Sequence, residues 1–253
     1  ALPRYRLAAA AVNTTPLDWN GNRKALLAAL ETARKNEAAI LCCPELCICG
    51  YGCEDAFFAP GVQQTSLDVL QEIAPATRGM AVAMGLPLAV GGKLYNAAAL
   101  IVDGRVRGFV CKQHLAGDGI HYEPRWFHPW PAGSRVDVEL AGETVPAGDL
   151  LFDCGVFRIG MEVCRDAWVA DRPCPRLAAG GANVVLNPSA SHFAFGKQEI
   201  RRRIALEASS EHGVAYVCSN LLGNESGRAI YDGGSMIAHA DNVVAAARRF
   251  SYE

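Results

Sequence analysis

Three residues of this sequence could carry covalent chemistry, and each comes directly after an apolar run. Glu45 follows residues 40–44, Lys112 follows residues 106–111, and Cys164 follows residues 157–163. A side chain at the end of a buried strand is held on a rigid element, and a carboxylate in that position can have a raised pKa. A raised pKa suits a general base, and a thiol suits a nucleophile. Glu45 and Cys164 are therefore candidates for a base and a nucleophile.

Each of the three residues also has an ordinary structural explanation. Glu45 could be a loop carboxylate that caps a helix, and Lys112 could be a surface lysine whose stem lies along apolar residues. Cys164 is one of ten cysteines, but charged neighbours distinguish it, because Arg165 and Asp166 follow it. A strand that ends in Cys and turns into a helix is typical of a nucleophile elbow, in which the next backbone N–H can face an oxyanion.

The elements that must position these residues alternate between strand-like and helix-like segments. Asp103-Gly104 lies between two apolar runs and predicts a hairpin turn. Asn20 or Asn22 is a possible N-cap for a helix with apolar residues at helical spacing from Leu26 to Ala33. The predicted strands are 7–12, 38–42, 80–90, 97–102, 106–111, 155–163, 183–186, 214–218, 235–240 and 243–248, and further helices are predicted at 66–73 and 198–212. The pattern predicts one α/β domain of mixed sheets with helices on their faces.

Composition and charge exclude several classes of protein. Hydrophobic residues make up 51% of the 253 residues, which argues against a disordered chain. The net charge is −2, and the chain has no basic stripe, so we expect no nucleic-acid partner. No apolar stretch approaches the roughly 18 residues of a membrane helix, and residues 1–6 do not look like a signal peptide. We therefore expect no membrane association.

Ten cysteines raise the question of a disulfide framework or a zinc site. Disulfide scaffolds are typical of small secreted chains with poor cores, unlike this one. The cluster from Cys42 to Cys53 has neither paired Cys-x-x-Cys spacing nor a nearby histidine, so it is not the pattern of a zinc site. Free thiols in apolar runs behave as small hydrophobes. The sequence therefore predicts a reduced, cytoplasmic protein without a metal or another cofactor.

Other candidate residues are explained more simply by structure. None of the six histidines lies in a motif for a Cys–His dyad. The aromatic residues Trp126, Phe127 and Trp130 are expected in the core or at its rim. The run 201–203 of arginines lies on the predicted helix 198–212, where nearby glutamates predict a solvated, ion-paired face.

Motifs along nearly the whole chain occur in an order and spacing known from one enzyme family. They are Pro44-Glu45-Leu46, Gly50-Tyr51, Cys53-Glu54-Asp55, Lys112 through Phe127 with Glu123 between, Gly160 through Trp168, Asn187 through Ser191, Gly196-Lys197 and Tyr231 through Ser235. On these segments the chain resembles the nitrilase (carbon–nitrogen hydrolase) superfamily, and more closely the glutaminase domain of glutamine-dependent NAD synthetases. The resemblance implies an α/β fold, a nitrilase-type four-layer α-β-β-α sandwich formed by residues 1–253 as a single domain.

The resemblance also implies catalytic roles for the matching residues. Glu45 would be the general base that takes the proton of the Cys164 thiol. Lys112 would stabilise the tetrahedral oxyanion, helped by the backbone N–H of Arg165, and Glu123 would orient the lysine and the substrate amide. The implied chemistry is thiolate attack on a carboxamide, loss of ammonia, a thioester, and hydrolysis by water activated at the glutamate.

Substrate recognition is implied for three further positions, Tyr51, Trp168 and Ser191, which match the family's glutamine-binding residues. The segment 115–119 departs from the bacterial pattern and looks nearer the eukaryotic-type loop, so contacts to the substrate in this segment are left open.

The expected function is hydrolysis of L-glutamine to glutamate and ammonia, with the ammonia used by a separate NAD synthetase subunit. The chain has no Ser-Gly-Gly-x-Asp-Ser loop for ATP, which is expected of a free-standing or excised glutaminase module that associates into homo-oligomers. Two alternatives are an amidase for another ω-amide or a small aliphatic amide, and a non-catalytic regulatory subunit of a synthetase. The complete set of Glu45, Lys112, Glu123 and Cys164 argues against the regulatory subunit.

Overall fold

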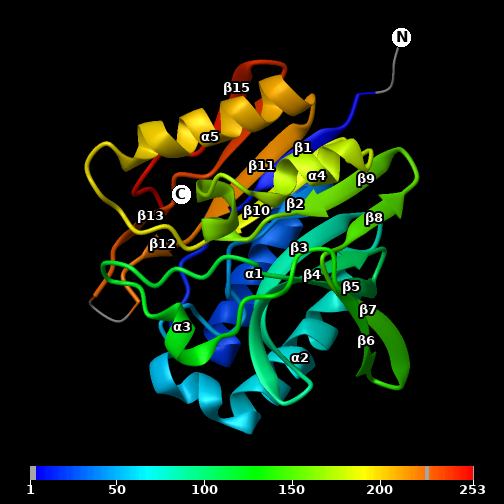
Figure 1. Cartoon of the computed structure of the whole chain (residues 1–253), viewed down its shortest axis with the longest axis vertical. Coiled ribbons are helices and arrows are strands. Elements are labelled where there is room, and N and C mark those ends of the chain that lie inside the picture. Colours follow the sequence, from blue (N-terminus) through cyan, green and yellow to red (C-terminus); the bar gives the residue numbers. More distant parts are fainter. Residues whose placement is uncertain (1–3, 226–227, 253) are drawn as a thin grey trace.

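Two β-sheets pack face to face in the computed structural model, and helices cover the outer face of each sheet (Figure 1). The structure describes residues 4–225 and 228–252, so the extreme ends of the predicted domain 1–253 lie outside the described residues. The layers follow the order helix, sheet, sheet, helix. The predicted α-β-β-α sandwich in a single domain is confirmed.

The first sheet has seven strands in the order β1-β2-β3-β4-β5-β7-β6. They are β1 (Arg6–Ala9), β2 (Ala38–Cys42), β3 (Ala81–Val90), β4 (Lys93–Val102), β5 (Arg105–Cys111), β6 (Arg135–Leu140) and β7 (Glu143–Gly148). Strands β1, β2 and β3 run parallel, and β4 pairs antiparallel with both β3 and β5. Because two antiparallel steps restore the direction, β2, β3 and β5 all end at the same edge of the sheet.

The second sheet has six strands in the order β15-β14-β11-β10-β9-β8. They are β8 (Leu151–Cys154), β9 (Phe157–Met161), β10 (Val184–Ser189), β11 (Ala215–Asn220), β14 (Met236–His239) and β15 (Asn242–Ala246). Strand β10 runs parallel to both β9 and β11, so these three strands also end at one edge. A separate ribbon pairs β12 (Leu222–Gly223) with β13 (Tyr231–Asp232).

The helices bury their apolar faces against the outer sides of the two sheets. Helices α1 (Trp19–Lys35) and α2 (Pro60–Ile73) cover the first sheet, and α4 (Pro173–Ala179) and α5 (Lys197–His212) cover the second. The short elements are η1 (Glu54–Phe58), η2 (Ala74–Thr77), α3 (Glu123–Trp126) and η3 (Cys164–Trp168). A separate apolar core lies between the two sheets, and β2 contributes Ile40 to it and β9 contributes Met161. The central strands are apolar along their whole length because both of their faces are covered.

The elements predicted from periodicity are mostly present, and the differences have physical causes. The hairpin at Asp103-Gly104 is confirmed, since both residues have the positive φ that its tight turn requires. Strands β6 to β8 and helix α4 were not predicted. The reason is clear for β6, which is an edge strand with mostly exposed residues and no apolar run. The predicted N-cap was wrong: Asp18 caps α1 by accepting from the Gly21 N–H, while Asn22 is buried.

A close approach between β3 and the segment after β2 positions Glu45. A Cβ atom at Gly85 would lie 2.2 Å from the backbone nitrogen of Leu46 and 2.8 Å from the carbonyl oxygen of Pro44. Only glycine leaves room for the segment 44–46 to cross β3 at this distance. The backbone of β3 therefore sets how deeply Glu45 enters the structure.

We expect Gly85→Ala to lower the free energy of unfolding by about 1–3 kcal/mol, because an extra methyl group overpacks this crossing. Urea unfolding measures the loss. Gly61→Ala is the matched control, because nothing lies within 4 Å of its added Cβ. An unchanged urea midpoint for Gly85→Ala would show that the segment 44–46 moves away freely.

Candidate active site

The three residues that follow the apolar runs meet where strands of the two sheets end. Glu45 comes three residues after β2 and Lys112 directly after β5, in the first sheet, and Cys164 comes three residues after β9, in the second. The side chains of Glu45 and Lys112 are 0% exposed, and Cys164 is 8% exposed. Residues from both halves of the chain therefore form one buried polar centre between the sheets.

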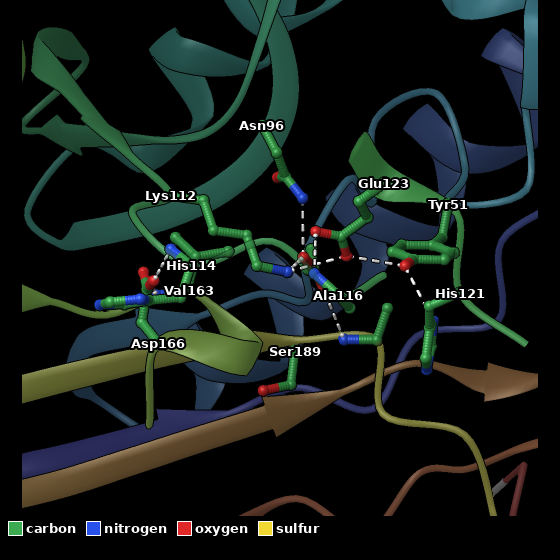
Figure 2. A network of polar contacts seen from close by, with 12 residues as sticks. Tyr51, Asn96, Lys112, His114, Ala116, His121, Glu123, Val163, Asp166 and Ser189 are labelled. Atoms are coloured by element: carbon green, nitrogen blue, oxygen red, sulfur yellow. Dashed lines mark hydrogen bonds and ion pairs between the residues drawn. The ribbon is translucent and has the colours of Figure 1, made fainter. Parts of the chain in front are cut away.

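The ammonium group of Lys112 lies between two carboxylates (Figure 2). Its Nζ donates to Glu45 Oε1 at 2.6 Å and to Glu123 Oε1 at 2.8 Å. An ammonium group has three N–H donors, so a third remains for another acceptor. Glu123 is fixed at the start of α3, because its backbone N–H donates to the Ala116 carbonyl and its Oε2 accepts the Ala116 N–H, both at 3.0 Å.

Glu45 also accepts hydrogen bonds from two other donors, one in each sheet. Asn96 of β4 donates through Nδ2 to Oε1 at 2.7 Å, and the Ala190 N–H, directly after β10, donates to Oε2 at 2.9 Å. The backbone N–H of Lys112 in turn donates to the Asn96 carbonyl at 2.8 Å. Both oxygens of Glu45 are therefore held in place, and its carboxylate has a fixed orientation.

Cys164 occupies a sharp turn between strand and helix. The residue has a φ of 43°, which is rare for a residue with a side chain, and η3 begins at this residue. The preceding residue, Val163, is still extended. Arg165 follows in the first turn of η3, where backbone N–H groups lack acceptors within the helix. This geometry matches the nucleophile elbow that the sequence predicted.

Asp166 ties the Cys164 turn to the segment that follows Lys112. Its Oδ1 accepts the N–H groups of Gln113 at 3.0 Å and His114 at 2.7 Å, and its Oδ2 accepts the Val163 N–H at 2.9 Å. Burial raises the pKa of Asp166 to about 7, although its backbone donors favour the charged form. The carboxylate thus fixes the distance between the two strand ends that carry the lysine and the cysteine.

Burial and the charges of the centre keep the cysteine in its thiol form at rest. The pKa of Cys164 is raised to about 12, first by burial and then by the Glu45 carboxylate, which outweighs the opposing effect of Lys112. Burial also raises the pKa of Glu45 above its usual value, despite the attraction of Lys112. Burial opposes the charge on Lys112, but the carboxylates of Glu123 and Glu45 outweigh it and raise the pKa of the lysine. Glu45 therefore has a raised pKa close to a protonated thiol, as a general base for that thiol would require.

The residues predicted to recognise a substrate lie in two places. Trp168 and Ser191 line one small cavity, and the Ser191 hydroxyl is buried without a hydrogen-bond partner among the described residues. Lys197, at the start of α5, places its Nζ 5.5 Å from the centre of the Trp168 ring. Tyr51 is not among the residues that line this cavity, and its hydroxyl donates to Glu123 Oε1 at 2.7 Å. Lys197 therefore adds a cation beside the predicted residue Trp168.

Two groups that the sequence did not single out also belong to this region. The ring of His121 lies 2.9 Å from that of His192 (Nε2 to Nδ1), and its Nδ1 lies 3.0 Å from the Tyr51 hydroxyl. Arg202 and Arg203 are exposed as expected of a solvated face, but Arg201 is not: it is 4% exposed, pairs with Asp232, and donates to the Ser191 carbonyl. Its helical spacing places it on the inner face of α5.

The cysteines outside the centre are structural in position. All ten are free, and those between Cys42 and Cys53 are buried. Among the described residues, no three His, Cys, Asp or Glu side chains are grouped so as to hold a metal ion. Within the same residues, no helix combines the length and the apolar character that crossing a bilayer requires.

Comparison with known proteins connects this site to one enzyme family. The carbon–nitrogen hydrolase family model matches residues 6–251. A glutamine-dependent NAD(+) synthetase of Rattus norvegicus is 31% identical over an aligned length of 262 positions, which covers 99% of this chain and 36% of that protein. The corresponding enzyme of Xanthomonas campestris is 32% identical over 82% of this chain and 35% of its own length. The chain thus spans a little over a third of these curated relatives.

Solved structures agree with the sequence relatives. A glutamine-dependent NAD(+) synthetase from Cytophaga hutchinsonii superposes with a TM-score of 0.92 at 43% identity, over 98% of this chain and 41% of that chain. An amidase of the nitrilase superfamily from Nesterenkonia superposes with a TM-score of 0.77 at 22% identity, over 98% of this chain and 89% of that chain. At this identity the amidase supports the fold alone.

The rate of Cys164 alkylation by iodoacetamide is expected to fall on the acid side of its pH profile. We expect Asn96→Leu to shift the midpoint of that fall to higher pH. Burial already raises the pKa of Glu45, and losing the Asn96 donor removes a contact that favours the carboxylate, so the base becomes protonated at a higher pH. Mass spectrometry of the Cys164 adduct over a pH series gives the midpoint. Asn183→Leu is the control, because Asn183 directly precedes β10, whereas the Ala190 N–H that binds Glu45 directly follows that strand. Equal midpoints in both variants would exclude Glu45 as the base.

Proposed function

The chain belongs to the carbon–nitrogen hydrolase family, in the nitrilase superfamily, and on that basis we propose that it hydrolyses the carboxamide of L-glutamine through a Cys164 thioester. One observation carries the proposal: a buried lysine is held between two carboxylates beside a cysteine at a sharp strand-to-helix turn. The groups needed for covalent amide hydrolysis are thereby present and oriented before substrate arrives.

In the first step, the Cys164 sulfur attacks the amide carbon while Glu45 takes the thiol proton. The carbonyl oxygen becomes an oxyanion, which the third N–H of Lys112 and the backbone N–H of Arg165 stabilise. Because Glu45 and Glu123 already hold the ammonium group, it needs no reorganisation as the charge develops.

In the second step, the intermediate collapses and the C–N bond breaks. Glu45 returns its proton to the departing nitrogen, so ammonia leaves and a thioester to Cys164 remains. Water then gives a proton to Glu45 and attacks the thioester carbon, and collapse of the second intermediate returns the proton to the sulfur. The balance is one amide and one water consumed, and one carboxylic acid and one ammonia formed.

Glutamine is the proposed substrate because of the polar groups close to this centre. Lys197 presents a cation that suits an α-carboxylate, and the unpaired Ser191 hydroxyl can meet the amino acid end of the substrate. Burial lowers the pKa of Lys197, so an anionic partner is favoured there. The names of the relatives support the same substrate, and we propose that the ammonia serves a NAD synthetase.

We expect Cys164→Ala to abolish ammonia release from glutamine, since no other atom can form the thioester. Glu45→Gln is expected to slow turnover by roughly 10²–10⁴-fold, because an amide cannot accept the thiol proton. Ammonia release and a mass-spectrometric search for the acyl adduct measure both effects. Cys174→Ala is the control, because that thiol belongs to α4 and is buried in the core that α4 forms with the second sheet.

An adduct located mainly on a cysteine other than Cys164 would contradict this assignment. Rapid hydrolysis of small aliphatic amides with glutamine ignored would favour the general amidase alternative. If no amide is hydrolysed, the chain is the non-catalytic subunit instead.

We expect Lys197→Met to raise the KM for glutamine by roughly tenfold to a hundredfold, the loss typical of a charged hydrogen bond to a substrate carboxylate. The KM for 4-aminobutyramide, which lacks only that carboxylate, should stay the same. Steady-state kinetics with both amides gives the comparison. A parallel rise in both KM values would mean that Lys197 supports the fold rather than the substrate.

A further inference from the structure

An ion pair joins the loop that follows Lys112 to the turn that carries the cysteine. Arg165 comes directly after Cys164, and its Nη1 lies 3.0 Å from Asp118 Oδ1 and 3.2 Å from Asp118 Oδ2. The side chain of Asp118 is 68% exposed and that of Arg165 is 38% exposed. The catalytic steps involve only the backbone N–H of Arg165, so the pair of side chains has a different role.

The same loop brings Asp118 to the side of the site where Lys197 lies. The Asp118 carbonyl accepts the His121 N–H at 3.2 Å, and the His121 ring packs against the His192 ring, with the ring centres 4.9 Å apart. Lys197 Nζ lies 3.1 Å and 3.5 Å from the two nitrogens of the His192 ring. Burial lowers the pKa of both histidines, so both rings are neutral near pH 7. Asp118 and Lys197 are therefore the charged groups at the two ends of this row of side chains.

Glutamine carries two opposite charges on its α-carbon, a carboxylate and an ammonium group. Lys197 suits the carboxylate, but a cation cannot also bind the ammonium group. The Ser191 hydroxyl can accept a hydrogen bond but carries no charge that balances an ammonium ion. Because both charged groups of the substrate are attached to one carbon atom, the partner of the ammonium group must be a carboxylate close to Lys197.

Two carboxylates act on Lys197, and they differ in how accessible they are. Burial lowers the pKa of Lys197, and the charges of Asp232 and Asp118 oppose that shift. Asp232 is buried, and its two oxygens already accept from Arg201 and Asn220. Asp118 is exposed, so it is the one of the two that a substrate can reach.

Asp118 can bind a second cation while it remains paired with Arg165. Arg165 approaches both oxygens through a single nitrogen, whereas a carboxylate has about four acceptor positions. Burial opposes the charge of Asp118, but Arg165 outweighs burial and lowers the pKa of the carboxyl group, which is therefore ionised near pH 7. The pair also fixes the carboxylate beside the turn of Cys164, where an α-ammonium group would otherwise meet a mobile side chain.

We propose that Asp118 binds the α-ammonium group of the substrate while Lys197 binds the α-carboxylate, and that Arg165 holds the Asp118 carboxylate in position. With Cys164 at the amide carbon, the site contacts three points of one molecule, and three points distinguish L-glutamine from D-glutamine. Asp118 is then a specificity-determining residue and Arg165 a positioning residue. This proposal rests on the proposed hydrolysis of glutamine and adds the second half of the amino acid site.

The experiment compares three amides: glutamine, 4-aminobutyramide, which lacks only the α-carboxylate, and glutaramate, which lacks only the α-amino group. Asp118→Asn should raise the KM for glutamine and for 4-aminobutyramide by roughly tenfold, near the lower limit for a charged hydrogen bond because Asp118 is exposed. The KM for glutaramate should not rise. Lys197→Met should give the complementary pattern, in which only 4-aminobutyramide is spared. The ratio of kcat/KM for L-glutamine to that for D-glutamine should also fall in Asp118→Asn.

Asp68→Asn is the matched control, because Asp68 is an exposed aspartate of α2, on the outer face of the first sheet. Asp118→Glu keeps the charge and should retain most of the preference for glutamine over glutaramate. Thermal unfolding of each variant identifies a failure to fold.

A rise in KM for all three amides in Asp118→Asn would overturn the proposal, because a loop that only shapes the site acts on all of them alike. Unchanged KM values for all three amides would overturn it as well. In both cases the unaltered protein still hydrolyses glutamine, so the proposed function stands. If the unaltered protein hydrolyses no glutamine, the proposed function and the role of Asp118 fail together.

Discussion

Burial of two carboxylates around one ammonium group is the interaction on which this site depends. Glu45 and Glu123 could not remain charged inside the protein without Lys112, because an unpaired buried charge is far too costly. The three charges leave a net charge of −1, and burial together with this excess negative charge keeps the thiol of Cys164 protonated at rest. The same lysine therefore stabilises the two buried carboxylates and only partly offsets the effect of burial and of Glu45 on the pKa of the Cys164 thiol.

The backbone around the centre is arranged so that these few side chains keep their orientation. Glu45 arrives through a crossing that only Gly85 allows, and Cys164 is held at a positive φ. Neither feature favours folding by itself, and both are maintained by contacts with neighbouring strands. Precision at the site is thus obtained from the rigid ends of β2, β5 and β9 rather than from long loops.

Much of this could be predicted from the sequence, for reasons that particular residues illustrate. Apolar runs placed Glu45, Lys112 and Cys164 near strand ends, but their grouping into one site followed from the resemblance to the nitrilase superfamily. Asn96 and Asp166 could not be found in this way, because their partners are distant in the chain: Asp166 contacts residues 52 and 53 positions away. The only local signal was a polar residue beside an apolar run. The pairing of His121 with His192 likewise depends on how segments 71 residues apart are brought together.

The carboxylate of Asp166 has a consequence for how the enzyme matures. It belongs to the second sheet and binds backbone groups that follow β5 in the first, while Ala190 of the second sheet binds Glu45 of the first, across 145 residues of sequence. Neither sheet alone contains an oriented base, a placed lysine and a turned cysteine. The centre therefore forms only after residue 190 has been made and the two sheets have paired, and separation of the sheets takes the base and the lysine away from the cysteine.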